Sequence, residues 1–273
     1  MERLVPLLGK TLVIVAHPDD EIVGCGALLQ RVREPLVLFA TDGAPRARYF
    51  WEKHGSREAY ARIRREEARA ALAGIGVSQI EFLPPEPNPS QLFVDQDLFL
   101  NIPSALEAIT EIVTHVRPEA LLTLAYEGGH PDHDTCAFLT WWIAREFVLP
   151  VWEMPLYHRS LAGAAVQQEF VLPEGNEVLF DATLAEVHRK LKAWDAYVSQ
   201  QSTLGMFNAA VERFRPQASY DFRRPPHPGV LNYEAWQWPV TGSQLVQAFG
   251  CCIDCHLRRF EVQHPGSAIR GLA

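Results

Sequence analysis

Short apolar runs alternate with segments of helical length along the first 150 residues, and this alternation constrains the fold more than any other feature. Two runs rich in branched aliphatic residues, 11–16 and 35–43, flank a segment of helical length and apolar spacing at 21–33. A strand that is apolar throughout is typical of a parallel sheet buried on both faces. The three segments therefore predict a βαβ unit with the usual right-handed crossover.

The same alternation continues to about residue 150. Further helices are expected over residues 56–74, 102–116 and 135–147, and further strands over 79–83 and 119–125. Ser56 is suited to cap the first of these helices, Gly74 to end it, and Pro103 to occupy the first turn of the second. The pattern predicts an α/β fold with a mostly parallel, Rossmann-like sheet flanked by helices.

Beyond residue 150 the pattern is less regular. We expect strands at 151–159 and 177–182, a helix at 183–201, and loops with aromatic anchors over 214–240. The proline-rich residues 84–90 are also expected to be irregular. We interpret residues 1–273 as one α/β domain, with 202–273 as a C-terminal extension packed on it whose structure the pattern does not predict.

Composition excludes several classes of protein. The 273 residues are 48% hydrophobic, which is enough for a full core, and the net charge of −8 comes without a run of Lys and Arg. No apolar stretch reaches the length that spans a bilayer, and the N-terminus carries charge too early for a secretory signal. The five cysteines are an odd number, which favours reduced thiols. We expect a cytoplasmic protein without nucleic-acid or membrane partners, and the sequence leaves homo-oligomerisation open.

The tripeptide His-Pro-Asp occurs twice, each time directly after a predicted strand. It lies in AHPDDE at 16–21 and in GGHPDHD at 128–134. Ligands of open α/β sheets bind outside the carboxyl ends of the strands. If the two strands are parallel and close, one small volume receives six side chains that can bind a metal or transfer protons: His17, Asp19, Asp20, His130, Asp132 and His133.

These residue types point to a metal-dependent hydrolase. Carboxylates held together raise one another's pKa, and a bound dication relieves this repulsion. Two imidazoles and one carboxylate with an open position are the usual ligands of catalytic zinc, with iron(II) or another transition metal as alternatives. Asp19 and Asp20 must point in different directions, so one could bind the metal while the other takes a proton from water. His130 backed by Asp132 could stabilise an oxyanion and protonate a leaving nitrogen.

Simpler interpretations exist for each motif. Asp19, Asp132 or Asp134 could merely cap a helix, although both loops having that role at matching strand ends would be a coincidence. The segment CCIDCH has the C-x-x-C-H spacing of covalent haem attachment. It could instead hold a structural metal, and the simplest interpretation is the end of a buried element that happens to use cysteine. The residues concerned are Cys251, Cys252, Cys255 and His256.

The two motifs in this order resemble the PIG-L/LmbE-like zinc-dependent de-N-acetylases, which hydrolyse N-acetylglucosaminyl and related amides. The segments TDGAPR (41–46), RIRREEARAALAGIGV (62–77) and KAWDAYVSQ (192–200) are also similar to family elements. The likeness covers roughly residues 11–201. The long aromatic loop 44–56, the last seventy or so residues and CCIDCH depart from the family pattern.

The resemblance implies roles for individual residues. His17, Asp20 and His133 would bind the metal, Asp19 would be the general base, and His130 would stabilise the oxyanion and protonate the leaving amine, oriented by Asp132. Arg64 would bind substrate, while Glu21 and Asp42 would support the site from behind. We therefore expect a deacetylase acting on a small sugar-like amide. An amidase that cuts a larger acyl group from a thiol-sugar conjugate, or a non-catalytic ligand-binding protein of the same fold, are the alternatives.

Overall fold

A seven-stranded sheet forms the centre of the computed structural model, which describes the backbone of residues 2–83 and 93–263 and side chains as far as residue 256. The strand order is β3-β2-β1-β4-β5-β9-β8. The strands are β1 (Lys10–Val15), β2 (Glu34–Phe39), β3 (Gln79–Phe82), β4 (Ala120–Leu124), β5 (Val151–Met154), β8 (Val178–Leu179) and β9 (Arg213–Pro216). Strands β6 (Tyr157–Arg159) and β7 (Ala165–Gln167) form a separate two-stranded sheet.

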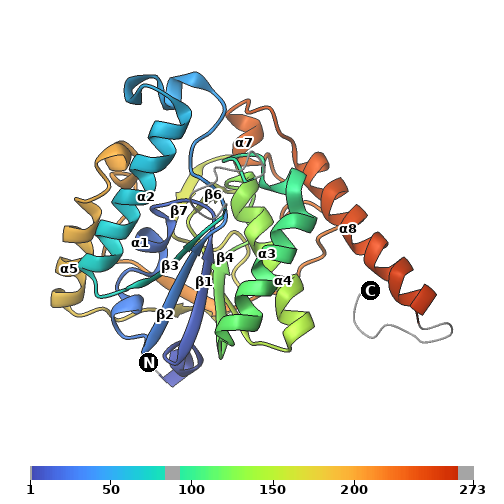
Figure 1. Cartoon of the computed structure of the whole chain (residues 1–273), viewed down its shortest axis with the longest axis horizontal. Helices are drawn as coiled ribbons and strands as arrows, with labels where there is room; N and C mark the ends of the chain where they lie inside the picture. The colour runs from blue at the N-terminus through green and yellow to red at the C-terminus, as the bar shows by residue number, and fades with distance from the viewer. Residues whose placement is uncertain (1, 84–92, 264–273) are drawn as a thin grey trace.

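Helices cover the sheet on both sides. The α-helices are α1 (Asp20–Cys25), α2 (Arg57–Gly74), α3 (Ile102–Val116), α4 (Pro131–Phe147), α5 (Leu184–Trp194), α6 (Gln201–Leu204), α7 (Asn232–Ala235) and α8 (Gly242–Gln263). Short 3-10 turns lie at η1 (Glu2–Leu7), η2 (Leu28–Gln30), η3 (Arg48–Phe50), η4 (Glu52–His54), η5 (Leu98–Asn101) and η6 (Val198–Gln200). In Figure 1, α2 and α5 lie to one side of the strands, and α3 and α4 lie to the other.

The predicted α/β sheet is confirmed. Strands β3, β2, β1, β4 and β5 are all parallel, and only β9, which pairs antiparallel with both β5 and β8, runs in the opposite direction. Strand β1 pairs with β2 on one side and with β4 on the other, with Thr11 opposite Ala120 and Ile14 opposite Thr123. From β1 the chain adds β2 and β3 on one side, and it then returns to add β4 on the other side of β1. The boundary between β1 and β4 is therefore the topological switch point, where open α/β sheets form ligand sites.

Two long helices agree with the sequence prediction. Helix α2 begins after Ser56, whose side chain accepts a hydrogen bond from the Ala59 N–H, and ends at Gly74. Helix α3 spans the predicted residues, with Pro103 in its first turn. Local capping and periodicity are sufficient to define such helices.

Other elements differ from the prediction for reasons of tertiary structure. Helix α1 is only six residues long, because the N–H groups of Ala27 and Leu28 donate to the buried Glu212 carboxylate at 2.7 and 3.0 Å. Helix α4 begins four residues earlier than expected, at Pro131. Strand β9 falls in the region expected to be loop, and α8 was not predicted. Residues 84–90, expected to be irregular, lie outside the described residues.

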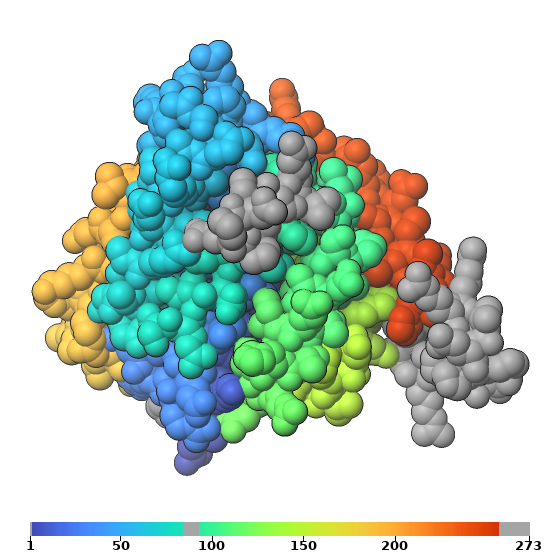
Figure 2. Space-filling model, in the orientation of Figure 1, coloured from blue at the N-terminus to red at the C-terminus, as the bar shows by residue number. Residues whose placement is uncertain are grey.

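The C-terminal portion packs on the same body. Strand β9 pairs with β5 and β8 inside the main sheet, so residues beyond 201 complete the sheet. Helix α8 forms one flank of the molecule, coloured red in Figure 2. Within the described part of the chain, no helix combines the length and apolar character that crossing a membrane requires.

Candidate metal centre

The two His-Pro-Asp loops meet at the carboxyl ends of β1 and β4. His17 follows β1, His130 is the N-cap of α4, and His133 lies in the first turn of that helix. The ring centroid of His17 is 4.4 Å from that of His130 and 5.3 Å from that of His133, and the last two are 5.0 Å apart. Pairing of adjacent parallel strands thus brings together residues more than a hundred positions apart.

Asp20 connects the two histidines that the family resemblance assigns to the metal. One carboxylate oxygen, Oδ2, accepts the backbone N–H of His17 at 2.8 Å and lies 3.4 Å from Nδ1 of the same residue. The other, Oδ1, lies 3.2 Å from Nε2 of His133. All three side chains are buried. A cation between them would have two imidazole nitrogens and a carboxylate oxygen within reach.

The donor atoms of the cluster fit a divalent transition metal. Among the described residues, two groups have ligand atoms within 4.8 Å of one another: His17, His130 and His133, and His17, Asp95, His130 and Asp132. Asp20 belongs to neither group despite its contacts. Neither ring nitrogen of His133 has a hydrogen bond to a described residue. A buried nitrogen without a hydrogen bond is costly, and a cation bound by Nε2 of His133, which lies 3.2 Å from Asp20, would satisfy one of the two. The geometry therefore supports a metal and leaves the choice between Asp20 and Asp95 to experiment.

Asp19 lies beside this cluster in a strained backbone conformation. Its φ of 128° is in the region that favours glycine, and such strain in non-glycine residues clusters at functional sites. Its N–H donates to Oε2 of Glu21 at 3.1 Å, and its Oδ2 lies 3.1 Å from Nη2 of Arg64. Burial raises the pKa of Asp19 to about 7, against the charge of Arg64, which lowers it. A carboxyl group with this pKa can both take and return a proton near neutral pH.

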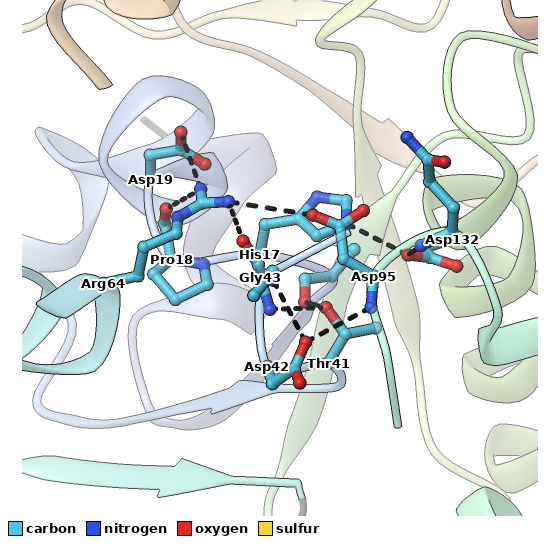
Figure 3. Close-up of polar contacts among 12 residues, drawn as sticks. His17, Pro18, Asp19, Thr41, Asp42, Gly43, Arg64, Asp95 and Asp132 are labelled. Carbon is cyan, nitrogen blue, oxygen red and sulfur yellow. Dashed lines mark hydrogen bonds and ion pairs between the residues drawn. The ribbon is translucent and has the colours of Figure 1, made fainter. Parts of the chain in front are cut away.

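Arg64 crosses the site from helix α2 and is almost fully buried. Its guanidinium donates to the carbonyl oxygens of Gly43 at 2.6 Å and Pro18 at 2.5 Å, and lies 3.8 Å from Asp95 (Figure 3). Gly43 has a φ of +64°, and a Cβ there would lie 2.9 Å from Pro18 Cδ and 3.1 Å from Arg64 Nη1. The helix residue expected to bind substrate is therefore at the cavity, next to Asp19.

Asp95 is the residue that sequence reasoning missed. Its Oδ1 lies 3.3 Å from Nε2 of His17 and 3.4 Å from Nε2 of His130, and this oxygen has no hydrogen bond to a described residue. No motif marks it in the sequence. It follows strand β3, so its position at the carboxyl end of a sheet strand was the only available signal, and the proline-rich segment before it obscured that signal.

Asp132 orients a different histidine from the one expected. Its Oδ2 is 3.0 Å from Nε2 of His17 and 3.9 Å from Nδ1 of His130. The carboxylate is also held by the N–H groups of Gln96 at 2.6 Å and Leu98 at 3.1 Å. Nδ1 of His130 instead accepts the backbone N–H of Asp132 at 3.1 Å. Because Nδ1 of His130 is an acceptor, its Nε2 carries the proton of the neutral ring.

The electrostatics of the cluster favour positive charge. Burial acts to lower the pKa of His17, but the carboxylates of Asp95 and Asp20 raise it above its ordinary value. Burial acts to raise the pKa of Asp20, but His133 and His17 bring it below its ordinary value. For His130, burial and the charge of His17 lower the pKa to about 4. The carboxylates thus favour a protonated, positively charged His17. A metal cation at this position would likewise balance the negative charge of the carboxylates.

Glu21 and Asp42 lie behind the site, as expected. The hydroxyl of Tyr197 makes a short contact to Glu21, whose pKa burial raises to about 8. Asp42 contacts Arg57 and accepts the N–H of Ala44 at 3.0 Å. Tyr197 comes from the KAWDAYVSQ segment, so this element supports the first His-Pro-Asp loop.

A cavity of about 210 Å³ opens onto these polar groups. His17, Asp19, Asp20, Arg64, Asp95 and His130 line its polar end. Its remaining lining is mostly apolar and aromatic: Val23, Phe50, Leu156, Tyr157, Leu204, Met206, Phe207, Trp236 and Trp238. Five of these residues lie beyond position 201, so the C-terminal portion forms part of the cavity wall.

The CCIDCH segment lies on α8, away from this cavity. All five cysteines are free thiols, and Cys251 and Cys255 are exposed. Neither of the compact ligand groups found in the described part of the chain includes Cys251, Cys252, Cys255 or His256. These residues instead line a second groove, of about 540 Å³, between α8 and the start of α3. The structure gives no support to a structural metal there.

Comparison with known proteins finds a similar family for the part of the chain that carries the site. Residues 12–144 match the PIG-L family, described as GlcNAc-PI de-N-acetylase. The chain is 32% identical over 149 residues to the 1D-myo-inositol 2-acetamido-2-deoxy-alpha-D-glucopyranoside deacetylase of Kineococcus radiotolerans, a match covering 45% of this chain and 41% of that protein. The chain therefore spans less than half the length of this curated relative.

Two solved structures share the fold. The A40926 pseudoaglycone deacetylase Dbv21 is 21% identical, with a TM-score of 0.58 over 77% of this chain and 99% of that chain. The zinc-inhibited form of teicoplanin deacetylase Orf2 is 17% identical, with a TM-score of 0.59 over 77% of this chain and 98% of that chain. At these identities the likeness concerns the fold.

Proposed function

Because residues 12–144 of this chain match the PIG-L family, we propose that the protein is a metal-dependent amide hydrolase. It removes an N-acetyl or other short acyl group from a small sugar-like substrate. The observation that carries this proposal is the convergence of three buried histidines with the carboxylates of Asp19 and Asp20, beside a cavity that His17, His130 and both carboxylates line. That set contains both metal ligands and a separate base, which hydrolysis requires.

His17, Asp20 and His133 would hold the metal, for which we propose zinc. The mixed nitrogen and oxygen donors support this choice over calcium or magnesium, which prefer oxygen alone. When bound, the cation supplies Lewis acidity that lowers the pKa of water and polarises the amide carbonyl. Asp132 holds Nε2 of His17, which leaves Nδ1, on the side of Asp20, for the metal. Such carboxylate support is usual for metal-binding histidines.

Asp19 acts as the general base. Its Oδ2 is engaged by Arg64, so Oδ1 remains to accept a proton from water as the water oxygen attacks the carbonyl carbon. The π electron pair of the carbonyl then moves onto its oxygen. Collapse of this intermediate breaks the C–N bond, and the nitrogen leaves as an amine once it receives a proton. Arg64 keeps Asp19 in place and offers its charge to the substrate.

His130 stabilises the oxyanion through Nε2–H. Its Nδ1 already accepts a backbone N–H, so the donor of the neutral ring is Nε2–H, which lies 3.4 Å from Oδ1 of Asp95 in the cavity lining. Protonation of the leaving nitrogen by His130, which the family resemblance implies, requires a cationic ring. The pKa of His130 is lowered to about 4, whereas that of Asp19 is raised to about 7. Asp19, which took the proton from water, can return it to the nitrogen.

The substrate and location complete the proposal. The named relatives are deacetylases of 1D-myo-inositol 2-acetamido-2-deoxy-alpha-D-glucopyranoside and of the A40926 pseudoaglycone, and we propose a sugar-like amide here by analogy. A thiol-sugar conjugate with a larger acyl group would use the same residues and differ only in how it fills the cavity. A cytoplasmic location is in keeping with five free cysteines.

The test joins metal analysis to a substrate screen. Purified protein is assayed for bound zinc and iron, and for amine release from N-acetylated sugars and from amides with longer acyl groups. We expect about one equivalent of metal and turnover of at least one class. Asp19→Asn should keep the metal and reduce kcat by about 100-fold or more, because it removes the base.

His133→Ala is the companion variant. It should lose the metal and the activity together, because the ring is a ligand. Glu52→Gln changes an exposed side chain that pairs with Arg48 and is absent from the cavity lining, and it should leave both unchanged. Full activity of Asp19→Asn on a proven substrate would show that the base is another residue. Metal binding without turnover of any amide would favour the ligand-binding alternative.

A further inference from the structure

Tyr157 is a cavity residue whose hydroxyl has no assigned partner. It is the first residue of β6 and lines the cavity together with His17, Asp19 and Asp20. It lies beyond residue 144, where the family match ends. Among the described residues, none forms a hydrogen bond with this hydroxyl. Tyrosine hydroxyls at largely apolar sites usually find a partner, so this one is available to a bound molecule.

The backbone of Tyr157 is held firmly against the second His-Pro-Asp loop. A single oxygen of Glu127, Oε1, accepts the N–H groups of Leu156 at 2.9 Å and Tyr157 at 3.0 Å. On the loop side, a Cβ on Gly129 would lie 1.8 Å from the carbonyl oxygen of Tyr157, so only glycine allows this approach. Gly129 directly precedes His130, and Glu127 lies three residues before it. The loop and Tyr157 are therefore positioned as one unit.

The ring of Tyr157 is also confined. Its centroid is 5.3 Å from that of His133, at an interplanar angle of 65°. The ring centroids of Phe207 and Trp236 lie 6.2 and 6.0 Å from that of Tyr157. These contacts restrict rotation about the side-chain bonds, so the hydroxyl is presented with little loss of entropy on binding. The phenol is thereby held next to one of the residues expected to bind the metal.

We propose that the Tyr157 hydroxyl donates a hydrogen bond to the carbonyl oxygen of the bound acyl group, a role that rests on the proposed hydrolase function. Water attack moves the carbonyl π pair onto that oxygen, and the hydrogen bond strengthens as negative charge develops there. Tyr157 gives up no proton, so the proton balance remains with Asp19. Together with Nε2–H of His130, it forms a pair of preorganised donors, which is the arrangement that stabilises oxyanions in enzymes.

A purely structural role for Tyr157 makes a different prediction. The aromatic contacts with His133, Phe207 and Trp236 belong to the ring, and Tyr157→Phe preserves them. If the ring merely forms the cavity wall, the phenylalanine variant should behave as wild type. If the hydroxyl contacts the acyl oxygen, the variant should lose transition-state stabilisation while the metal and the fold remain.

The experiment compares Tyr157→Phe with wild type in zinc content, kcat and KM on the best amide from the screen, and affinity for acetohydroxamate by calorimetry. We expect unchanged zinc, a kcat about 10- to 100-fold lower with KM changed less than threefold, and acetohydroxamate binding about tenfold weaker. Acetohydroxamate carries the same carbonyl oxygen and needs no turnover. The binding arm therefore tests Tyr157 even if no amide is hydrolysed.

Tyr126→Phe is the matched control. Tyr126 is buried and donates to the carbonyl oxygen of Arg224 at 2.8 Å, away from the cavity lining. Its variant should keep wild-type kcat and acetohydroxamate affinity. Wild-type values for Tyr157→Phe in both arms would overturn the proposed hydrogen bond. If wild type hydrolyses no amide but Tyr157→Phe still binds acetohydroxamate more weakly, the hydrolase function is rejected. The hydrogen bond from Tyr157 to the carbonyl oxygen is then retained.

Discussion

At the residue scale, the central question is which carboxylate completes the metal site. Asp20 contacts both His17 and His133, but Asp95 contacts His17 and His130 at comparable distances. In the first arrangement the metal lies toward His133, whose ring nitrogens lack hydrogen-bond partners among the described residues. In the second, Nε2 of His133 would keep only its 3.2 Å contact with Asp20. We therefore favour Asp20 as the ligand and assign Asp95 to the substrate side of the cavity.

Two isosteric variants distinguish these arrangements. Asp20→Asn should lower zinc affinity by at least tenfold, because a neutral amide is a poor ligand for a transition metal. Asp95→Asn should keep wild-type zinc affinity and instead reduce kcat/KM by about tenfold or more, since it removes a charge that faces Arg64 and His130. Zinc affinity is measured by competition with a chromophoric chelator. Loss of zinc from Asp95→Asn alone would assign the metal to the other group.

At the element scale, one helix terminus joins two distant parts of the chain. Helix α5 begins with a capping box in which Thr183 and Glu186 satisfy one another's backbone N–H groups. The same Glu186 carboxylate accepts two hydrogen bonds from Arg31, each at 2.6 Å. These hydrogen bonds from Arg31 lower the pKa of Glu186 from 4.5 to about 2. A local cap therefore also attaches α5 to the segment that follows α1.

Glu186→Gln tests this attachment through pH. Glutamine can retain the capping box but loses the charge that binds Arg31. Because the folded pKa is depressed, the carboxylate stabilises the protein fully above its unfolded pKa of 4.5, and this contribution disappears as pH falls toward 2. At pH 7 the variant should be less stable by about 2 kcal/mol. In urea unfolding at successive pH values, this deficit should shrink below pH 4.5, and a constant deficit would contradict the assignment.

At the scale of the whole molecule, a buried ion pair ties the C-terminal third to the first βαβ unit. The Lys190 ammonium donates to Glu212 at 2.7 Å and to the carbonyl of Val23 at 2.8 Å, and both charged residues are buried. Glu212 also accepts the N–H groups that end α1. Because Glu212 precedes β9 directly, the pair positions the strand that completes the sheet. Residues beyond 201 should therefore unfold with the rest of the domain.

Glu212→Gln should lower the free energy of unfolding by about 3–5 kcal/mol, because it leaves the Lys190 charge buried without a counter-charge. Urea unfolding followed by tryptophan fluorescence and by circular dichroism should give one coincident transition for wild type. The matched control is Glu52→Gln, whose exposed partner Arg48 lies 4.0 Å away, and it should change stability by less than about 0.5 kcal/mol. Two separate transitions in wild type would contradict the single-domain interpretation.

Much of the fold was predictable because its signals are local. The alternation of apolar strands and capped helices was sufficient for the parallel sheet, and Ser56 and Gly74 marked the two ends of α2 correctly. The boundaries that failed depend on distant partners. Helix α1 ends just before Ala27 and Leu28, whose N–H groups donate to Glu212. Residues 213–216 form strand β9 because they pair with β5 and β8.

The sequence by itself determined the nature of the site: two His-Pro-Asp loops at the ends of two strands supply imidazoles and carboxylates, since residue type and local turn geometry are properties of short segments. Only the tertiary structure decided which strands are neighbours, and hence that Asp95 and Tyr157 join the site while Asp132 turns to His17. Those relations depend on strand pairing and long-range packing, and no short segment encodes the position of a residue remote from it.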